Sequence, residues 1–191
     1  MEPSVRLSWL PLGAGGRSVR LNGRLFEWVV ARCQHRPPRD LYHAALQLED
    51  GEERYVVEMA PAWDRLAEQR GVVRTGPVGL RVLGRLVWFR YEVRLWRDGV
   101  IPDLAEAVGP DLSLPTDAQR VARLMTAAPG VPPLTWGRDE LGLGEMWNSN
   151  SLVAWLLAVS GHDVDTVSPP EGGRAPGWGA GITLAARQRS P

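Results

Sequence analysis

A serine at the start of an apolar helix is the residue of this sequence best placed to do chemistry. Ser149 lies within Asn148-Ser149-Asn150-Ser151, and apolar residues follow at the spacing of one helix face, up to Gly161. The first turn of a helix leaves backbone N–H groups unpaired and carries a partial positive charge, which stabilises an anion. Ser149 therefore lies where an anion would be stabilised, and we expect the function of the protein at this helix start. The alternative is that the Asn and Ser side chains only cap the helix.

His43 and Glu58 are the candidate base and its orienting carboxylate. Two β-prone runs, 41–48 and 54–59, flank Asp50-Gly51, a dipeptide typical of a two-residue hairpin turn. If Glu49 faces Glu52 across the turn, the same register places His43 opposite Glu58. A carboxylate beside an imidazole fixes its tautomer and raises its basicity, as a general base requires. The alternative is a surface cross-strand pair that contributes only slightly to stability.

Polar and aromatic residues near the Asn/Ser helix are candidate ligand contacts. A glycine-punctuated loop, residues 134–144, leads directly into this helix. We expect the following side chains to line a cleft: Trp136, Arg138, Asp139, Trp147, Asn148, Asn150, Arg174 and Trp178. For Arg138-Asp139-Glu140 a solvated charge cluster is the alternative, because exposed pairs contribute little.

The sequence predicts neither a metal nor a cofactor site. His162, Asp163 and Asp165 form a weak metal candidate without further ligands. Gly13-Ala14-Gly15-Gly16 lacks the context of a dinucleotide-binding fingerprint. The single Cys33 excludes an internal disulfide and a cysteine-built zinc site, fits a reducing compartment, and is expected to be a buried structural residue.

The periodicities predict one α+β domain over residues 1–191, an antiparallel sheet packed against helices. We expect strands over 4–10, 41–48, 54–59 and 182–186, a longer β-like region over 82–96, helices over 22–33 and 117–128, and the Asn/Ser helix. Thr116 and Gln119 form a capping-box pattern before the second of these helices. Residues 63–68 are expected to form a short helix or lid, and residues 187–191 a frayed tail.

Composition argues against two classes of partner, nucleic acid and the membrane interior. The 22 basic and 22 acidic residues give no net charge and hence no global field toward nucleic acid. No stretch of about 18 apolar residues predicts a membrane span, and no signal peptide is visible, so a cytoplasmic location is expected. Every basic residue is arginine, for which a GC-rich genome is the simpler explanation.

The order of these motifs resembles the circularly permuted branch of the papain-like superfamily, which includes NlpC-type amidases and lecithin:retinol acyltransferase-like enzymes. The matching residues are His43 within Leu41-Tyr42-His43-Ala44-Ala45-Leu46, and Asn148-Ser149 before the apolar helix. The resemblance implies a permuted papain-like fold with Ser149 as nucleophile, His43 as base and Glu58 as third group. Asn-Ser-Asn-Ser stands where members of that branch carry Asn-Cys.

Two functions from different classes follow. The first is a hydrolase or acyltransferase that acts on an amide or ester of a peptide or small molecule, with Ser149 attacking the carbonyl and His43 moving the proton. A serine hydroxyl is far less acidic than a thiol, so it depends on that base. The second is an inactive papain-like pseudoenzyme that binds a peptide or small polar ligand in the same cleft.

Overall fold

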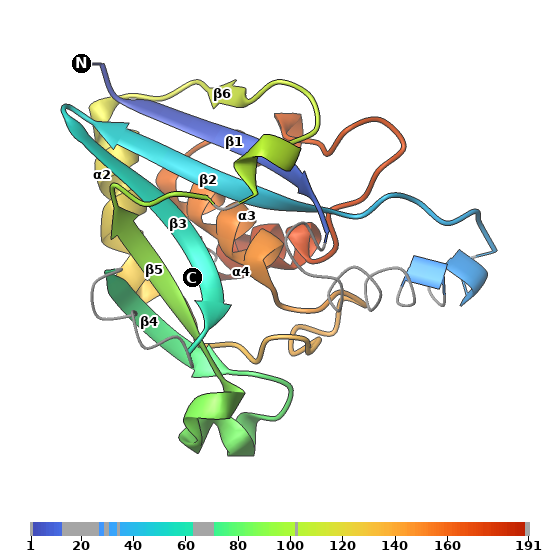
Figure 1. The fold of residues 1–191 in the computed structure, drawn as a ribbon. Coiled ribbons are helices and arrows are strands. Elements are labelled where there is room, and N and C mark those ends of the chain that lie inside the picture. Colours follow the sequence, from blue (N-terminus) through green and yellow to red (C-terminus); the bar gives the residue numbers. More distant parts are fainter. Residues whose placement is uncertain are drawn as a thin grey trace.

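Six antiparallel strands form one sheet, in the spatial order β4-β5-β3-β2-β1-β6. The computed structural model describes residues 2–12, 27–28, 31–33, 35–62, 71–101 and 103–189 (Figure 1). The strands are β1 (Ser4–Pro11), β2 (Tyr42–Asp50), β3 (Glu53–Pro61), β4 (Val72–Pro77), β5 (Arg90–Arg97) and β6 (Leu112–Leu114). The predicted α+β class with an antiparallel sheet is confirmed.

The α-helices cover one face of the sheet, behind it in Figure 1, whereas the short helix η4 lies on the front face. The α-helices are α2 (Ala118–Ala127), α3 (Ser149–Ser160) and α4 (Trp178–Arg189). The short 3₁₀ helices are η2 (Arg81–Arg85), η3 (Val87–Phe89), η4 (Leu104–Glu106), η5 (Ala128–Gly130) and η6 (Val164–Thr166). The Asn/Ser helix lies where it was predicted, with Gly161 in the left-handed region after its end.

The core lies between the sheet and α3, and strand alternation decides which residues enter it. Successive side chains of a strand point to opposite faces. On β2 the even-numbered residues Tyr42, Ala44, Leu46 and Leu48 belong to the core cluster. The odd-numbered residues of β2 therefore face the opposite side of the sheet, the side on which η4 lies.

The hairpin of β2 and β3 forms as predicted, but its register is wrong by two residues. Asp50 pairs with Glu53, and Leu46 with Val57, so paired numbers sum to 103. The turn residues are Gly51, with a φ of +63°, and Glu52, one position later than Asp50-Gly51. Asp-Gly favours a turn at its own position, but an adjacent turn keeps the same faces because the shift in pairing is even.

The strand predicted over residues 182–186 is wrong, because these residues belong to α4. Gly181 allows this helix to lie directly against α3: a Cβ at position 181 would come within 2.2 Å of Ser151 O and 2.8 Å of Trp155 N. Packing of α4 against α3 thus overrides the local preference of this short segment. Residues 187–189 are helical as well, so the predicted frayed tail does not begin at 187.

Three further predictions, for the region 82–96, the cap of α2 and Cys33, differ from the structure. The β-like region 82–96 contains only one strand, β5, and its first half forms η2 and η3. Asp117, and not Thr116, caps α2, since its side chain accepts the Arg120 N–H. Cys33 is exposed, in contrast to the predicted buried residue.

Two expected segments lie outside the described residues, wholly or in large part: the helix over 22–33, of which only 27–28 and 31–33 are described, and the segment 63–68. In the described part of the chain, no helix combines the length and the apolar character needed to cross a bilayer.

Candidate functional site

The side chain of Asn150 joins the start of α3 to β2. Its Oδ1 accepts the Ala44 N–H at 2.7 Å, and its Nδ2 donates to Tyr42 O at 3.0 Å and to Pro176 O at 2.9 Å. Asn150 is only 2% exposed, so these bonds are shielded from water. The segment that contains His43 and the segment that contains Ser149 are more than a hundred positions apart in the sequence, and these hydrogen bonds bring them together.

The N-terminus of α3 is capped by its own side chains. Asn148 Oδ1 accepts the N–H groups of Asn150 and Ser151, and Ser151 Oγ accepts the Asn148 N–H, which makes a reciprocal capping box. Capping thus falls to Asn148 and Ser151. The Ser149 hydroxyl, partly exposed at the first helical position, makes no hydrogen bond within the described residues.

The imidazole of His43 lies on the other face of the sheet from α3. His43 alternates with Tyr42 and Ala44, whose side chains enter the core beside α3. The described residues provide no hydrogen bond between His43 and Ser149. Burial lowers the pKa of His43 below its ordinary value of 6.5, and the nearby charge of Asp103 opposes this effect. The ring is therefore neutral near pH 7 and stands beside Asp103.

The predicted pairing of His43 with Glu58 is wrong. Glu58 lies opposite Arg94 on β5 and accepts a hydrogen bond from Arg94 Nη1 at 3.1 Å. Arg94 is buried and also donates to Glu92 Oε2, so it holds two carboxylates on the same sheet face. Because the true register is shifted by two residues, Glu58 cannot orient His43, and Asp103 is the acidic neighbour that the sequence reasoning missed.

Trp178 and a residue that the sequence reasoning missed, Trp9, form an aromatic pair near the start of α3. Their ring centroids are 5.4 Å apart. Trp9 lies opposite Ala44 in the sheet, and Ala44 binds Asn150. Both indole Nε1 atoms are shielded from solvent and have no hydrogen-bond partner within the described part of the chain. A buried indole N–H usually finds an acceptor, so this pair is an exception.

Trp178 is brought to this place by Gly177. A Cβ at position 177 would lie 2.6 Å from Asn148 Oδ1, so the chain passes the cap of α3 in direct contact. Gly177 has a φ of +86°, which a residue with a side chain adopts only with strain. Trp178 then begins α4, whose Ala180 N–H donates to Glu145 Oε2 at 3.2 Å. The starts of both helices and the Trp9–Trp178 pair are thus neighbours.

The predicted contacts in the loop before α3 hold the loop itself. Trp136 O accepts the Gly79 N–H, and its ring packs edge-on against Tyr91 at 5.9 Å. Arg138 Nε donates to Gly79 O. The carboxylate of Asp139 accepts the N–H groups of Leu143 and Gly144, and these bonds lower its pKa.

Two aromatic side chains beneath this loop are buried. Trp147 belongs to the core cluster and is 2% exposed. Tyr91 donates its hydroxyl to Leu134 O at 2.9 Å, and burial raises its pKa to about 12, so it stays protonated at neutral pH. Both side chains fix the loop and are closed to solvent.

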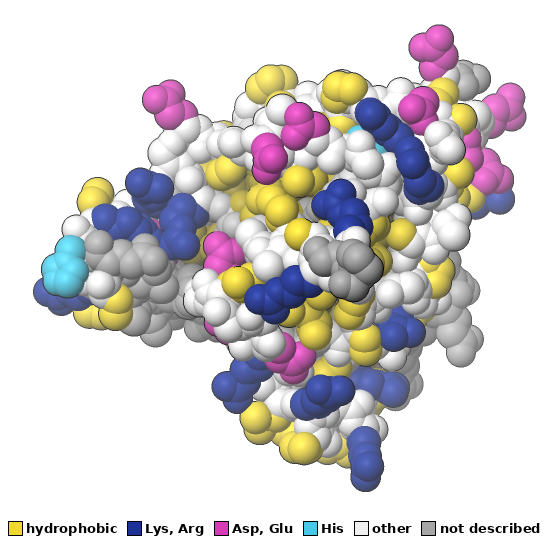
Figure 2. Space-filling model, turned by 180° about the vertical axis from the view of Figure 1, so that it is seen from behind, with side chains coloured by type: hydrophobic (Ala, Val, Ile, Leu, Met, Phe, Trp, Pro, Cys, Tyr) yellow, Lys and Arg dark blue, Asp and Glu magenta, His cyan; other side chains and the backbone are white. Residues whose placement is uncertain are grey.

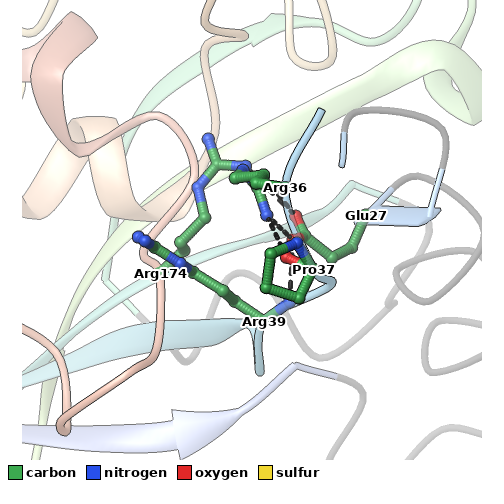
Figure 3. A network of polar contacts seen from close by, with 5 residues as sticks. All are labelled: Glu27, Arg36, Pro37, Arg39 and Arg174. Atoms are coloured by element: carbon green, nitrogen blue, oxygen red, sulfur yellow. Dashed lines mark hydrogen bonds and ion pairs between the residues drawn. The ribbon is translucent and has the colours of Figure 1, made fainter. Parts of the chain in front are cut away.

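Arg174 holds a second loop in place through its side chain and its backbone, and Figure 3 shows its side chain beside Glu27, Arg36 and Arg39. Its Nη1 pairs with Glu27 Oε2 at 3.1 Å, and its backbone O accepts the Tyr42 N–H at 2.8 Å. Burial alone would raise the pKa of Glu27, but hydrogen bonds from Arg36 and the Arg39 N–H, with the charges of Arg36 and Arg174, lower it. Arg174 is thus tied to a buried carboxylate.

The weak metal candidate at His162 has a structural explanation. Its Nδ1 lies 2.8 Å from Ser160 Oγ and its Nε2 lies 3.2 Å from Thr116 Oγ1, so both ring nitrogens have hydroxyl partners. Within the described ranges, no group of three or more His, Cys, Asp or Glu side chains is placed to hold a metal ion.

Comparison of the chain with family models, with curated proteins and with solved structures found no match.

Proposed function

We propose that this protein binds a small polar ligand or a peptide through an acceptor group, such as a carboxylate, at the start of α3, without transforming it. The observation behind the proposal is the Trp9–Trp178 pair. The rings of the two residues are in contact, and both of their indole N–H groups are withdrawn from water and have no partner among the described residues. A buried donor without an acceptor costs about 1–3 kcal/mol, and a ligand oxygen would recover that cost.

The surrounding groups favour an acceptor-bearing ligand. The Ser149 hydroxyl has no hydrogen bond within the described residues and stands at the positive end of α3. The Ser149 hydroxyl and the two indole N–H groups are all hydrogen-bond donors, and the N-terminus of α3 adds a partial positive charge. A carboxylate or carbonyl oxygen complements such a set, whereas a cation does not.

The position of His43 favours binding over turnover. A serine needs a base to take its proton, because a helix terminus alone does not activate a hydroxyl. The predicted base, the His43 imidazole, lies on the opposite face of the sheet from α3. The proposal extends to a permuted papain-like pseudoenzyme, supported by the docking of the His-bearing strand to the Asn/Ser helix through Asn150.

The indole ¹H–¹⁵N signals of the tryptophans provide the test. We expect N-acetylated dipeptides with a free carboxylate to shift the Nε1 signals of Trp9 and Trp178, assigned with Trp9→Phe and Trp178→Phe. The internal control is Trp155, whose Nε1 already donates to Gln188 Oε1 at 2.7 Å and should not respond. Signals of Trp9 and Trp178 that stay fixed during titration with the carboxylate, its amide and its ester would refute the proposal.

Acyl transfer at Ser149 is the second candidate. Two observations favour it: the Ser149 hydroxyl is unbonded within the described residues, and burial keeps His43 in the neutral state that a base requires. A serine-directed fluorophosphonate, followed by mapping of the adduct, separates the two functions. Acyl transfer requires an adduct that disappears in both Ser149→Ala and His43→Gln. The binding function predicts no adduct at Ser149.

A further inference from the structure

The connection between β4 and β5 forms a projecting lobe, residues 79–90, which we call the apolar lobe. Figure 1 shows it beyond the lower end of the sheet. It contains η2 and η3, and neither helix has a buried residue. The lobe consists of consecutive 3₁₀ turns with i→i+3 hydrogen bonds. The N–H groups of Leu83, Leu86 and Phe89 each donate to the carbonyl three positions earlier.

The apolar lobe exposes large hydrophobic side chains. Val82 is 78% exposed, Trp88 67% and Leu86 53%. The exposed large hydrophobic residues of the lobe are Leu80, Val82, Leu86, Val87, Trp88 and Phe89. Single exposed apolar residues are ordinary, but six within ten positions form a contiguous patch that marks an interaction surface.

The charge of the apolar lobe has one sign. Arg81, Arg85 and Arg90 lie within it, and no acidic residue occurs anywhere from 71 to 91. The whole chain has equal numbers of basic and acidic residues, so this segment departs from the rest. Figure 2 shows apolar and arginine surface together at this lower end of the molecule.

The apolar lobe is anchored to the body of the protein. The Val78 N–H donates to Phe89 O at 2.7 Å, which closes its base, and the Gly79 N–H donates to Trp136 O at 2.9 Å. Gly84 lies against Pro77, where a Cβ would come within 2.8 Å of the Pro77 Cβ. The lobe therefore presents its apolar tip in a fixed direction, away from the sheet.

We propose that the apolar lobe docks onto the surface of an anionic phospholipid bilayer. Apolar side chains with flanking arginines are suited to the boundary between anionic headgroups and acyl chains, where tryptophan is also favoured. A convex tip fits a deformable bilayer, whereas a protein partner would need a matching hollow. Nucleic acid would use the arginines but would leave the aliphatic tip residues Val82 and Leu86 in water.

The backbone limits the depth of insertion. Each 3₁₀ helix leaves its first N–H groups and last C=O groups without an intrahelical partner, and η2 and η3 are only five and three residues long. Unpaired backbone groups are costly within hydrocarbon, so the backbone stays at headgroup level while side chains reach further. This is peripheral docking without a membrane-crossing helix.

Co-sedimentation of the whole protein with phosphatidylcholine vesicles, with and without phosphatidylserine, tests the proposal. We expect binding to the anionic vesicles only, weakened by added salt. Arg81→Gln with Arg85→Gln should reduce partitioning by about 25-fold, from about fivefold for each arginine. Val82→Ser with Leu86→Ser should reduce it by at least about tenfold through lost apolar burial.

Matched variants elsewhere on the surface provide the control. Val100→Ser removes a residue that is 68% exposed but lies outside the lobe, and Arg54→Gln with Arg123→Gln removes two exposed arginines. These variants should bind vesicles as the parent protein does, with unchanged far-ultraviolet circular dichroism in every variant. Absence of binding to anionic vesicles, or lobe variants that bind equally well, would overturn the proposal. A dimer that Val82→Ser with Leu86→Ser dissociates, without vesicle binding, would assign the lobe to self-association instead.

Discussion

Asn150 binds Ala44 as a neighbouring strand would, through a hydrogen bond of 2.7 Å from the Ala44 N–H to its Oδ1. β3 pairs with β2 only as far as Leu46. Beyond that point, backbone groups of β2 that no longer bond to β3 bond to other partners: Tyr42 O accepts from the Asn150 amide, and the Tyr42 N–H donates to Arg174 O. One helix side chain and one loop backbone therefore complete the hydrogen bonding of β2.

Removing the Asn150 amide should destabilise the fold strongly. Asn150→Ala leaves the Ala44 N–H and the Tyr42 carbonyl without their partner in a buried place, at about 1–3 kcal/mol for each unsatisfied group, whereas Pro176 O keeps its hydrogen bond from Asn148 Nδ2. We expect a loss of about 3 kcal/mol or more in the free energy of unfolding, measured by urea denaturation. Ser149→Ala is the control and should change it by less than about 0.5 kcal/mol. Equal losses in the two variants would contradict the bridging role.

The contact of α3 with α4 should not tolerate a methyl group at position 181. In Gly181→Ala the new Cβ would meet the backbone of Ser151 and Trp155, which cannot move cheaply. We expect a loss of about 1–3 kcal/mol in unfolding free energy. Gly130→Ala is the matched control, because a Cβ there meets nothing within 4 Å. A Gly181→Ala protein as stable as Gly130→Ala would show that the helices are further apart than described.

The buried histidine should make stability fall with acid. Burial lowers the pKa of His43, so below about pH 6.5 the unfolded chain binds a proton that the folded chain refuses. The contribution of neutral His43 to the free energy of unfolding is therefore fully present above about pH 6.5. It is lost as the pH falls from there through the lowered pKa. Thermal unfolding followed between about pH 7.5 and about pH 5 should show this fall.

Replacement of the histidine separates its contribution from that of other groups. In His43→Gln the fall in melting temperature should shrink, and His162→Gln should reduce it further, because burial also lowers the pKa of His162. A fall that is unchanged in His43→Gln would contradict the assignment.

Loss of the Glu27 charge should loosen the loop that carries Arg174. Glu27→Gln removes the carboxylate that pairs with Arg36 and Arg174 in a buried place. We expect destabilisation of about 1.5–3 kcal/mol and faster amide hydrogen exchange at Arg174. Glu52→Gln, at an exposed turn position, should change neither quantity. Unchanged exchange at Arg174 in Glu27→Gln would mean that the ion pair does not hold the loop.

The sequence was sufficient where several signals agreed. The capped apolar helix at 149–160 and the hairpin around Gly51 carry both periodicity and boundary residues, and both are present. The prediction of a strand over 182–186 was wrong because packing of α4 against α3 overrides the local preference of a five-residue segment. The first half of the β-like region predicted over 82–96 was wrong because apolar residues in 3₁₀ turns resemble the alternation of a strand.

The candidate site shows the same division. From the sequence we predicted that the His43 and Ser149 segments lie together, but not that the His43 side chain points to the other face of the sheet. The signal was present: Tyr42, Ala44 and Leu46 alternate with His43, and the apolar set must face the helix. Asp103 and the shielded N–H of Trp9 could not have been found, because both depend on tertiary placement with no local pattern.

The two border strands of the sheet have a consequence for behaviour at high concentration. β6 has only three residues, and β4 contains an irregularity between Val72 and Arg74. Short or bulged border strands offer few consecutive free peptide groups to another molecule, which hinders growth of intermolecular β-structure. The protein is thus shielded from fibril formation along both borders.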